Sequence, residues 1–174
     1  APDADFVVHG QEKVFQTGIA ALAQLTEGKV HLGTDGRTNP SKAFTGAPDA
    51  VVHRFKGPHP AGNVGTQIHA VAPVNKGETV WTLHYQDVII IGRLFLSGKF
   101  DAVRHIALTG SEVKKPRYYK ALIGCNIKSF VEGNVENGHN RYISGNVLTG
   151  TKINSEGYLG YYDTQITVIP EDGE

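Results

Sequence analysis

The residues best placed to bind a ligand lie in a short segment rich in glycine and proline, Gly57 to Gly65. Two prolines and three glycines in nine residues exclude a helix or strand interior, so this segment must be a loop. A loop that leads into a helix offers free backbone N–H groups and the positive end of the helix dipole, which can hold an anion. Gly57, Gly62 and Gly65 would let the backbone approach a ligand closely, and His59 adds a titratable group between the prolines.

The spacing within this loop differs from both common phosphate-binding motifs. It is neither G-x-G-x-x-G nor G-x-x-x-x-G-K-[ST], no lysine follows to reach a phosphate, and both prolines remove N–H donors. Two hypotheses therefore stay open for Gly57 to Gly65: a site for an anion or cofactor, and a rigid structural turn.

Histidine and cysteine supply the next candidates for chemistry. Four histidines lie close together in the sequence: His53, His59, His69 and His84. Their spacing is not a recognised metal-ligand motif. Two hypotheses stay open for them: a metal site assembled by folding, and ordinary surface or core roles. Cys125 is the only cysteine, which excludes an internal disulfide and an iron–sulfur cluster, and we expect it to be a small core residue. No nucleophile–base pair is visible, so we predict no catalytic residue. Because no histidine spacing is a recognised ligand motif, we name no residue as a metal ligand.

Tyrosines form a further set in the second half of the chain: Tyr118, Tyr119, Tyr158, Tyr161 and Tyr162. Such side chains can stack on a ligand ring or on a partner surface. Because aromatic residues are also favoured in strands, we expect these tyrosines to pack within a sheet.

The first half of the chain reads as alternating strands and helices. We expect a strand at Asp5–Val8, a helix from Gln11 that is capped by Gly28, a strand at Lys29–Gly33, an exposed excursion at Thr34–Asp49, and a strand at Ala50–Phe55. The helical face of the second element carries Phe15, Ile19, Leu22 and Thr26. Strand, helix and strand in about thirty residues predict a β-α-β unit and hence a parallel sheet.

Two more helices are predicted after the glycine- and proline-rich loop. One begins at Asn63 and ends at Pro73; a turn at residues 75–77 and a short strand at Thr79–Leu83 follow. The next helix holds Asp87 in its first turn and is apolar in almost every direction from Val88 to Leu96. We therefore expect it to be buried on most sides and capped by Gly98.

The chain from Val103 onward is instead rich in short strands. The expected elements are strands at Val103–Leu108, Arg117–Ile123, Arg141–Ile143, Asn146–Leu148 and Tyr158–Ile169, with one short helix from Asn126 to Val131. This change of pattern near residue 100 predicts two domains, 1–100 and 101–174.

Composition limits the classes of partner. Lysine plus arginine equals aspartate plus glutamate, 17 against 17, so nucleic acid is not an expected partner. The most apolar run, Val88 to Phe100, is interrupted by Gly92, Arg93 and Lys99 and does not predict a membrane span. The chain contains no methionine and starts at Ala1, from which we expect an internal piece of a longer polypeptide.

Four segments together resemble the A subunits of the sodium-translocating NADH:quinone oxidoreductases. They are Leu25–Val30, Gly57–Gly62, Tyr85–Ile89 and Ile143–Gly150, supported by Gly92, Leu94 and Phe95. The resemblance covers nearly the whole chain except Thr34–Asp49, and His84 departs from it. It implies a Rossmann-like α/β domain followed by a soluble-ligand-binding β-grasp (SLBB-like) module.

The resemblance also implies a function. The A subunits are peripheral and lie on the cytoplasmic side of the bacterial inner membrane, in a complex that couples NADH oxidation by quinone to sodium export. The expected partners are the other subunits of that complex, including its membrane subunits. The implied role is docking and scaffolding, with a contribution to ubiquinone binding. The resemblance also implies that this chain holds neither flavin nor NADH and that it does not catalyse the reaction alone.

Two alternatives accompany this hypothesis. The first is a flavin- or nucleotide-binding oxidoreductase domain of a complex I-like or related electron-transport subunit, which copurifying flavin would favour. The second is the analogous subunit of a related complex with ferredoxin-type clusters, against which the single cysteine argues.

Overall fold

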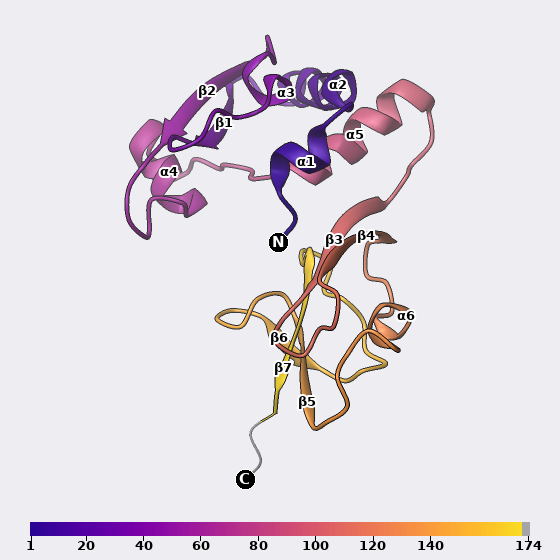
Figure 1. Cartoon of the computed structure of the whole chain (residues 1–174). Helices are drawn as coiled ribbons and strands as arrows, with labels where there is room; N and C mark the ends of the chain where they lie inside the picture. The colour runs from indigo at the N-terminus through magenta and orange to yellow at the C-terminus, as the bar shows by residue number, and fades with distance from the viewer. Residues whose placement is uncertain (172–174) are drawn as a thin grey trace. The chain divides into compact units, whose positions relative to one another are not determined.

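The computed structural model describes residues 1–171 and divides into two compact units (Figure 1). One unit is Ala4–Asp101, and the other joins Ala1–Asp3 to the chain from Ala102 onward. Among residues 1–171, no helix combines the length and the apolar character that a membrane span requires. The fold is mixed α/β, as the sequence predicts.

The first unit is built around two parallel strands. Its elements are α1 (Ala4–Val8), α2 (Glu12–Ala23), β1 (Val30–Asp35), α3 (Lys42–Thr45), β2 (Ala50–Phe55), α4 (Val64–Val71) and α5 (Tyr85–Ser97). Strands β1 and β2 pair in register from Val30 opposite Ala50 to Asp35 opposite Phe55. A parallel sheet is therefore present as expected, but its strands are β1 and β2, joined by a crossover that contains α3. The predicted β-α-β unit of Asp5–Val8, the helix from Gln11 and Lys29–Gly33 is not formed.

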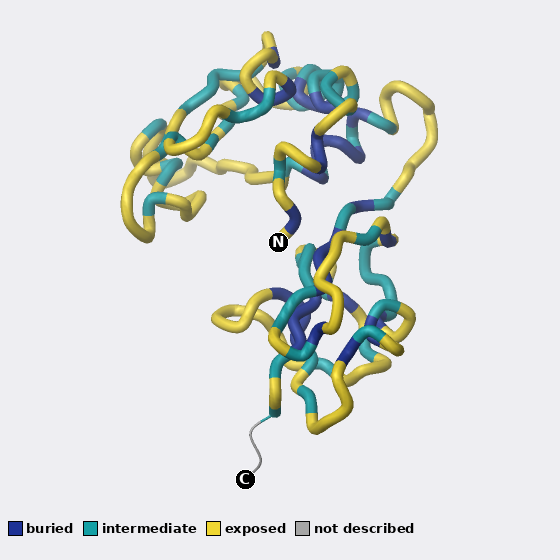
Figure 2. The backbone as a smooth tube through the Cα atoms, viewed as in Figure 1, coloured by how far each residue is buried: buried dark blue, intermediate teal, exposed yellow. Residues whose placement is uncertain are grey.

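The core of this unit lies between one face of the sheet and the helices. Buried side chains from four helices form it: Val7, Val8, Phe15, Ile19, Ala43, Phe44, Val88 and Ile89, with Ala47 beyond α3. Val30, Leu32 and Ala50 pack against this cluster from the sheet. The ring of Phe44 meets Phe15 edge-on with centroids 5.1 Å apart. In Figure 2 the dark blue, buried segments accordingly follow α2 and the first part of α5.

Helices α2 and α5 approach each other through two glycines. A Cβ atom on Gly18 would lie 2.2 Å from the carbonyl oxygen of Val88, and one on Gly92 would lie 1.9 Å from that of Val14. Neither distance is possible for a real carbon atom, so the contact requires glycine on both helices.

Two predictions near the start of the chain are wrong. Asp5–Val8 lies in helix α1 and not in a strand, because Val7 and Val8 are both buried while Phe6 is exposed, a pattern that alternating strand faces cannot give. Helix α2 ends at Ala23, and Gly28 does not cap it. The Thr26 hydroxyl instead accepts a hydrogen bond from the Gly28 N–H at 3.1 Å, which forms a turn beyond the helix.

Three further predictions in this unit need correction. The segment Thr34–Asp49 is not simply an exposed excursion, since the Ser41 hydroxyl caps α3 and Phe44 enters the core. Thr79–Leu83 is not a strand, and no described strand pairs with it. Helix α5 is buried only in its first part, because Phe95 is 67% exposed and Leu94 and Leu96 are also exposed.

The remaining predictions for the first unit are confirmed. Strands occupy Val30–Asp35 and Ala50–Phe55, and α4 ends at Val71, two residues before Pro73. Asn63 is the N-cap residue of α4, although its side chain makes no capping hydrogen bond. Gly98 ends α5 in the left-handed conformation with φ of 70°.

The second unit contains a mixed five-stranded sheet and one short helix. Its elements are β3 (Val103–Thr109), β4 (Arg117–Leu122), α6 (Lys128–Val131), β5 (Asn140–Ser144), β6 (Thr151–Ile153) and β7 (Gln165–Pro170). The strand order is β4-β3-β7-β5-β6, in which β3 and β7 are parallel and the other pairs are antiparallel. The hairpin of β3 and β4 is followed by α6, and the last strand, β7, pairs with β3. This order is compatible with the expected β-grasp arrangement.

One face of this sheet packs under α6 and the loops. Ile106, Leu108, Ile166 and Val168 from the strands meet Ile127, Val131 and Leu159 there. The Asn126 side chain accepts from the Lys128 N–H at 2.9 Å, but the N-cap residue of α6 is Ile127, so Asn126 lies one position before the cap.

Two strand predictions in the second unit are wrong or too long. Asn146–Leu148 is a turn, because the Asn146 side-chain oxygen accepts from the N–H groups of Leu148 and Thr149. The last strand covers only Gln165–Pro170, and Tyr158 makes an isolated bridge to Asn126.

Candidate functional site

The loop between β2 and α4 is held by two consecutive turns. The Ala61 N–H donates to the Pro58 carbonyl at 2.9 Å, and the Asn63 N–H donates to the Pro60 carbonyl at 2.8 Å. These hydrogen bonds fix the path of the glycine- and proline-rich loop from the end of β2 to the first turn of α4. His59 lies exposed within it.

A cavity of about 240 Å³ lies where the carboxyl ends of β1 and β2 meet this loop. Its lining residues come from both strand ends, the loop and α4: Gly33, Thr34, Asp35, Arg37, Phe55, Gly57, Ala61, Gly62 and Gln67. The carboxyl edge of a parallel sheet is where α/β folds commonly bind ligands. Of the four candidate residues, Gly57 and Gly62 line this cavity, whereas His59 and Gly65 do not.

The polar groups of the cavity are already engaged with one another. Arg37 donates to both carboxylate oxygens of Asp35, with Nη2 at 2.7 Å, and these hydrogen bonds lower the pKa of Asp35 to about 2. Arg54 braces the same turn by donating to the Thr38 carbonyl at 2.7 Å. Gln67 covers Gly33: a Cβ atom added to Gly33 would lie 2.4 Å from the Oε1 atom of Gln67.

This arrangement can accept a small, mainly neutral group more readily than a phosphate. No lysine lines the cavity, and the Asp35 carboxylate already occupies the guanidinium of Arg37. Whether Gly57, His59, Gly62 and Gly65 contact a ligand stays a prediction.

The four histidines of the sequence argument lie on different elements. His53 is on β2, His59 in the loop, His69 on α4 and His84 at the N-cap of α5, where its Nδ1 accepts from the Gln86 N–H. Within residues 1–171, no three histidine, cysteine, aspartate or glutamate side chains are grouped to hold a metal ion.

Sequence reasoning missed one pair of histidines. His31 Nδ1 lies 2.9 Å from His53 Nε2 on the neighbouring strand. Burial, followed by the charges of His53 and Lys29, lowers the pKa of His31. The sequence placed both histidines on predicted strands. The register that brings them together follows only from the structure.

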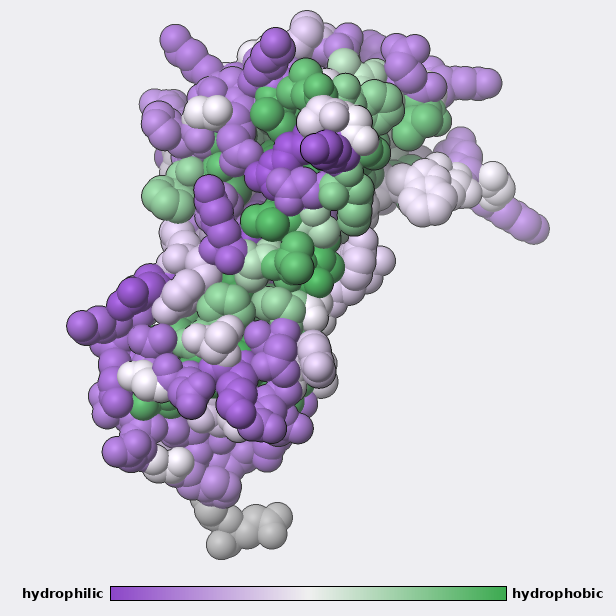
Figure 3. Space-filling view, turned by 90° about the vertical axis from the view of Figure 1, so that its right-hand side faces the viewer, coloured by the Kyte–Doolittle hydropathy of each residue, from purple (hydrophilic) through white to green (hydrophobic). Residues whose placement is uncertain are grey.

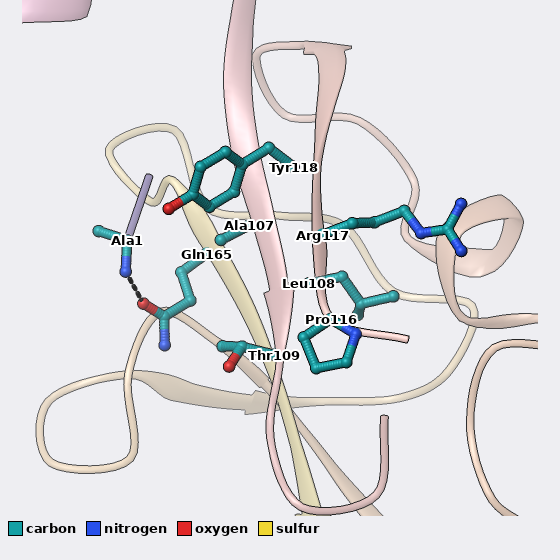
Figure 4. Close-up of a pocket in the computed structure, with 8 residues that line it drawn as sticks. All are labelled: Ala1, Ala107, Leu108, Thr109, Pro116, Arg117, Tyr118 and Gln165. Atoms are coloured by element: carbon teal, nitrogen blue, oxygen red, sulfur yellow. Dashed lines mark hydrogen bonds between the residues drawn. The ribbon is translucent and has the colours of Figure 1, made fainter. Parts of the chain in front are cut away.

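A second cavity, of about 510 Å³, belongs to the second unit (Figure 4). Ala1, Ala107, Leu108, Thr109, Pro116, Arg117, Tyr118 and Gln165 line it. In Figure 4 the side chains of Tyr118 and Gln165 lie on the same side of the strands, whereas the guanidinium of Arg117 extends away from them. The tyrosine ring offers an aromatic surface. The Gln165 amide is already engaged, because its oxygen accepts from the Ala1 amino group and its nitrogen donates to the Thr167 hydroxyl at 2.7 Å.

The expectation that the tyrosines pack within the sheet holds for Tyr118 and Tyr119 of β4 and is wrong for the other three. Tyr119 packs against the core, but Tyr118, Tyr158, Tyr161 and Tyr162 are 40%, 67%, 60% and 85% exposed. Three of them, Tyr158, Tyr161 and Tyr162, lie outside the regular strands, so they gain no cross-strand neighbours.

Cys125 is half-buried and packs against the core of the second unit, close to expectation. Burial raises the pKa of its thiol, which keeps it protonated near neutral pH and makes it a poor nucleophile.

The first unit also exposes large apolar side chains. They lie on the extended segment after α4 and on the second half of α5: Val74, Val80, Trp81, Leu83, Leu94, Phe95 and Leu96, with Trp81 86% exposed. Figure 3 shows hydrophobic side chains in green at the surface of this unit, on the side where α5 lies. Helix α4 buries no residue fully. Contiguous apolar surface of this kind is found where proteins bind other proteins, membranes or ligands.

Comparison with known proteins matches both units in order. A family model described as the NqrA second alpha/beta domain matches residues 1–100, and one described as the NQRA C-terminal domain, of the SLBB type, matches residues 105–155. Proteins named as the A subunit of Na(+)-translocating NADH-quinone reductase are similar over almost the whole chain. Those of Saccharophagus degradans and Neisseria meningitidis serogroup A are 41% and 42% identical over 173 residues, 98% of this chain.

A third relative, from Histophilus somni strain 2336, is 42% identical over 174 residues, 99% of this chain. The chain spans 38% of the length of each of these three relatives. An α/β unit followed by an SLBB unit is thus common to the structure and to the matched models.

Proposed function

Because this chain belongs to the A-subunit family of the Na(+)-translocating NADH-quinone reductases, we propose that it forms the central part of such a subunit. The proposed complex oxidises NADH with quinone and exports sodium ions, and the subunit lies peripherally on the cytoplasmic side of the bacterial inner membrane. The observation that carries this proposal is the ordered match of two family models, together with 41–42% identity over nearly the whole chain.

The role that we propose within the complex is docking and scaffolding. Two features of the first unit support it. Large apolar side chains such as Trp81 and Phe95 are exposed, and α4 contributes no fully buried residue. Within residues 1–171, no perturbed pair of titratable groups lies in a cavity with the geometry of an acid–base catalyst, so this part supplies surface more readily than chemistry. The proposed partners are the other subunits of the complex, including its membrane subunits.

We further propose that the first unit is part of a Rossmann-like domain, within domain limits of 1–100 and 101–174. Parallel pairing of β1 with β2, helices against one face and a cavity at the carboxyl ends support this. Two strands alone make a marginal sheet, and parallel sheets normally have more strands.

The proposal excludes resident flavin or NADH in this chain. The loop lacks a phosphate-binding motif, and Arg37 in its cavity is paired with Asp35. The flavin- or nucleotide-binding alternative is therefore not carried forward. We also propose that this chain contacts quinone, and the two cavities are the candidate binding sites.

Retention of the partner subunits by the tagged chain tests the docking role. The remaining subunits of the Histophilus somni complex are passed over the immobilised chain, and each retained subunit is quantified. We expect retention by the natural chain and a loss of at least about tenfold in a Trp81→Ser/Phe95→Ser variant, since a few buried aromatic anchors carry most interface energy. The control is Leu25→Ser, because Leu25 is also exposed, at 81%, but lies beyond α2. No retention by the natural chain contradicts the docking role, and equal retention by all three chains contradicts its placement at Trp81 and Phe95.

Quinone contact is tested separately by titrating a water-soluble ubiquinone analogue and following backbone amide chemical shifts. Shifts confined to Gly57–Gly65 would support the first cavity, and shifts at Ala107, Tyr118 and Gln165 would support the second. The absence of shifts at both places would leave a scaffold without quinone contact.

A further inference from the structure

His31 and His53 are brought together by the register of the parallel sheet. His31 lies opposite Val51, and Gly33 lies opposite His53, so the two histidines are diagonal neighbours on adjacent strands. Side chains two residues apart on a strand point to the same face, which places both imidazoles on one side of the sheet. The ring centroids are 5.1 Å apart with an angle of 34° between the planes.

This face of the sheet is open to solvent at the histidines. The opposite face packs against the core through Val30, Leu32 and Ala50. His31 is exposed and His53 is half-buried, whereas Gln67 of α4 covers the same face further along, at Gly33. An ion can therefore reach the pair without any movement of the core.

The separation of the two facing nitrogens suits a shared metal ion as well as a hydrogen bond. His31 Nδ1 and His53 Nε2 are 2.9 Å apart, so only one proton fits between them. Two imidazoles at 90° around an ion, with bonds of about 2.05 Å, place their nitrogens about 2.9 Å apart, whereas tetrahedral ligands need about 3.3 Å. The N–N distance thus matches neighbouring positions of a square-planar or octahedral ion better than those of tetrahedral zinc. Both rings must turn from their hydrogen-bonded orientation for the two nitrogens to face one ion.

We propose that His31 and His53 form a binding site for one divalent transition-metal ion, Cu²⁺ or Ni²⁺, whose other ligands are water molecules. No third histidine, cysteine or carboxylate joins the pair within residues 1–171, so two protein ligands hold the ion. Imidazole is a favoured ligand for both ions, and Cu²⁺ binds more tightly than Ni²⁺ at a given site. A bound ion links β1 to β2 and stabilises the folded chain relative to the unfolded one.

Titration of the 174-residue chain with Cu²⁺, followed by calorimetry and electron paramagnetic resonance, tests this site. We expect one tight equivalent whose spectrum shows coupling to two nitrogens, and a rise in Tm on binding. His31→Gln and His53→Gln should each weaken that equivalent at least tenfold. His139→Gln is the matched control, since His139 is an exposed histidine in the other unit.

Circular dichroism of each variant confirms that it is folded before its titration is compared. A spectrum with one nitrogen or none, or an equal loss of affinity in the His139→Gln control, overturns the proposal. So does a tight equivalent that survives in both the His31→Gln and the His53→Gln variants.

Discussion

At the scale of single residues, the glycine- and proline-rich loop separates into two kinds of position. Gly57 and Gly62 line the cavity beside the carboxyl ends of the strands, whereas His59 and Gly65 do not. The composition of the segment identified a shaped loop, because proline and glycine restrict the backbone in known ways. Which of its residues reach the cavity depends on the turns at Pro58 and Pro60, and spacing alone does not determine that.

The first prediction concerns His59. We expect His59→Ala to change the free energy of unfolding by less than about 0.5 kcal/mol, because the side chain is exposed and lines neither cavity. Urea unfolding measures this, and the quinone-analogue titration should give the same amide shifts as the natural chain. A loss of those shifts in the variant would place His59 in a binding site.

At the scale of elements, predictions that rested on local rules were the more reliable. Strands β1, β2, β3 and β4, the end of α4 before Pro73 and the Gly98 cap follow from residue pattern and are confirmed. Helix α1 was mistaken for a strand because a run of apolar residues as short as Phe6–Val8 has no distinguishing period. The exposed end of α5 was missed because hydropathy shows that a side chain is apolar but not what covers it.

The second prediction concerns the crossing of α2 and α5. We expect Gly92→Ala to lower the free energy of unfolding by more than about 2 kcal/mol, because the added methyl group collides with the Val14 carbonyl and forces the helices apart. Gly65→Ala is the matched control: Gly65 also lies in a helix, with nothing within 4 Å of the added carbon, so the variant should be neutral or slightly stabilised. Comparable destabilisation of both variants in urea would contradict the close helix contact.

The third prediction concerns the carboxylate that joins the edge of the second sheet. Glu171 accepts from Arg141 Nε of β5 at 2.9 Å and pairs with Lys152 of β6 at 2.7 Å, and these contacts lower its pKa from 4.5 to about 2. Because the pKa is lower in the folded state, the stabilisation is present above pH 4.5 and is lost as the pH falls toward 2. Glu171→Gln should therefore lower Tm at pH 7 but not at pH 2. An equal effect of the substitution at both pH values would contradict this.

At the scale of the whole molecule, the chain consists of two compact units with separate cores. The core around Phe15 and Phe44 belongs to Ala4–Asp101, and the core around Ile106 and Ile166 belongs to the chain from Ala102 onward. The change from helical to strand periodicity near residue 100 prompted the predicted domain limits. The family was predicted from the order of several short motifs, which carry more information than any one of them.

The fourth prediction follows from the separate cores. We expect residues 102–174, expressed alone, to fold with the amide spectrum that they show in the whole chain, because their hydrophobic cluster is complete within the unit. Heteronuclear NMR compares the two spectra directly. A collapsed, poorly dispersed spectrum of the isolated segment would contradict the domain limits proposed here.

The measurement that tests the proposed function most directly is replacement of the matching segment in a relative. In the Histophilus somni protein, which is 42% identical over this span, the segment is exchanged for the 174-residue chain, and sodium-dependent NADH–quinone reduction is assayed in membranes. We predict an assembled complex with at least about a tenth of the natural rate, because the proposed role of this segment is to supply fold and surface, with NADH and flavin held elsewhere. A chimeric protein that folds and accumulates but neither joins the complex nor supports quinone reduction would contradict the proposal.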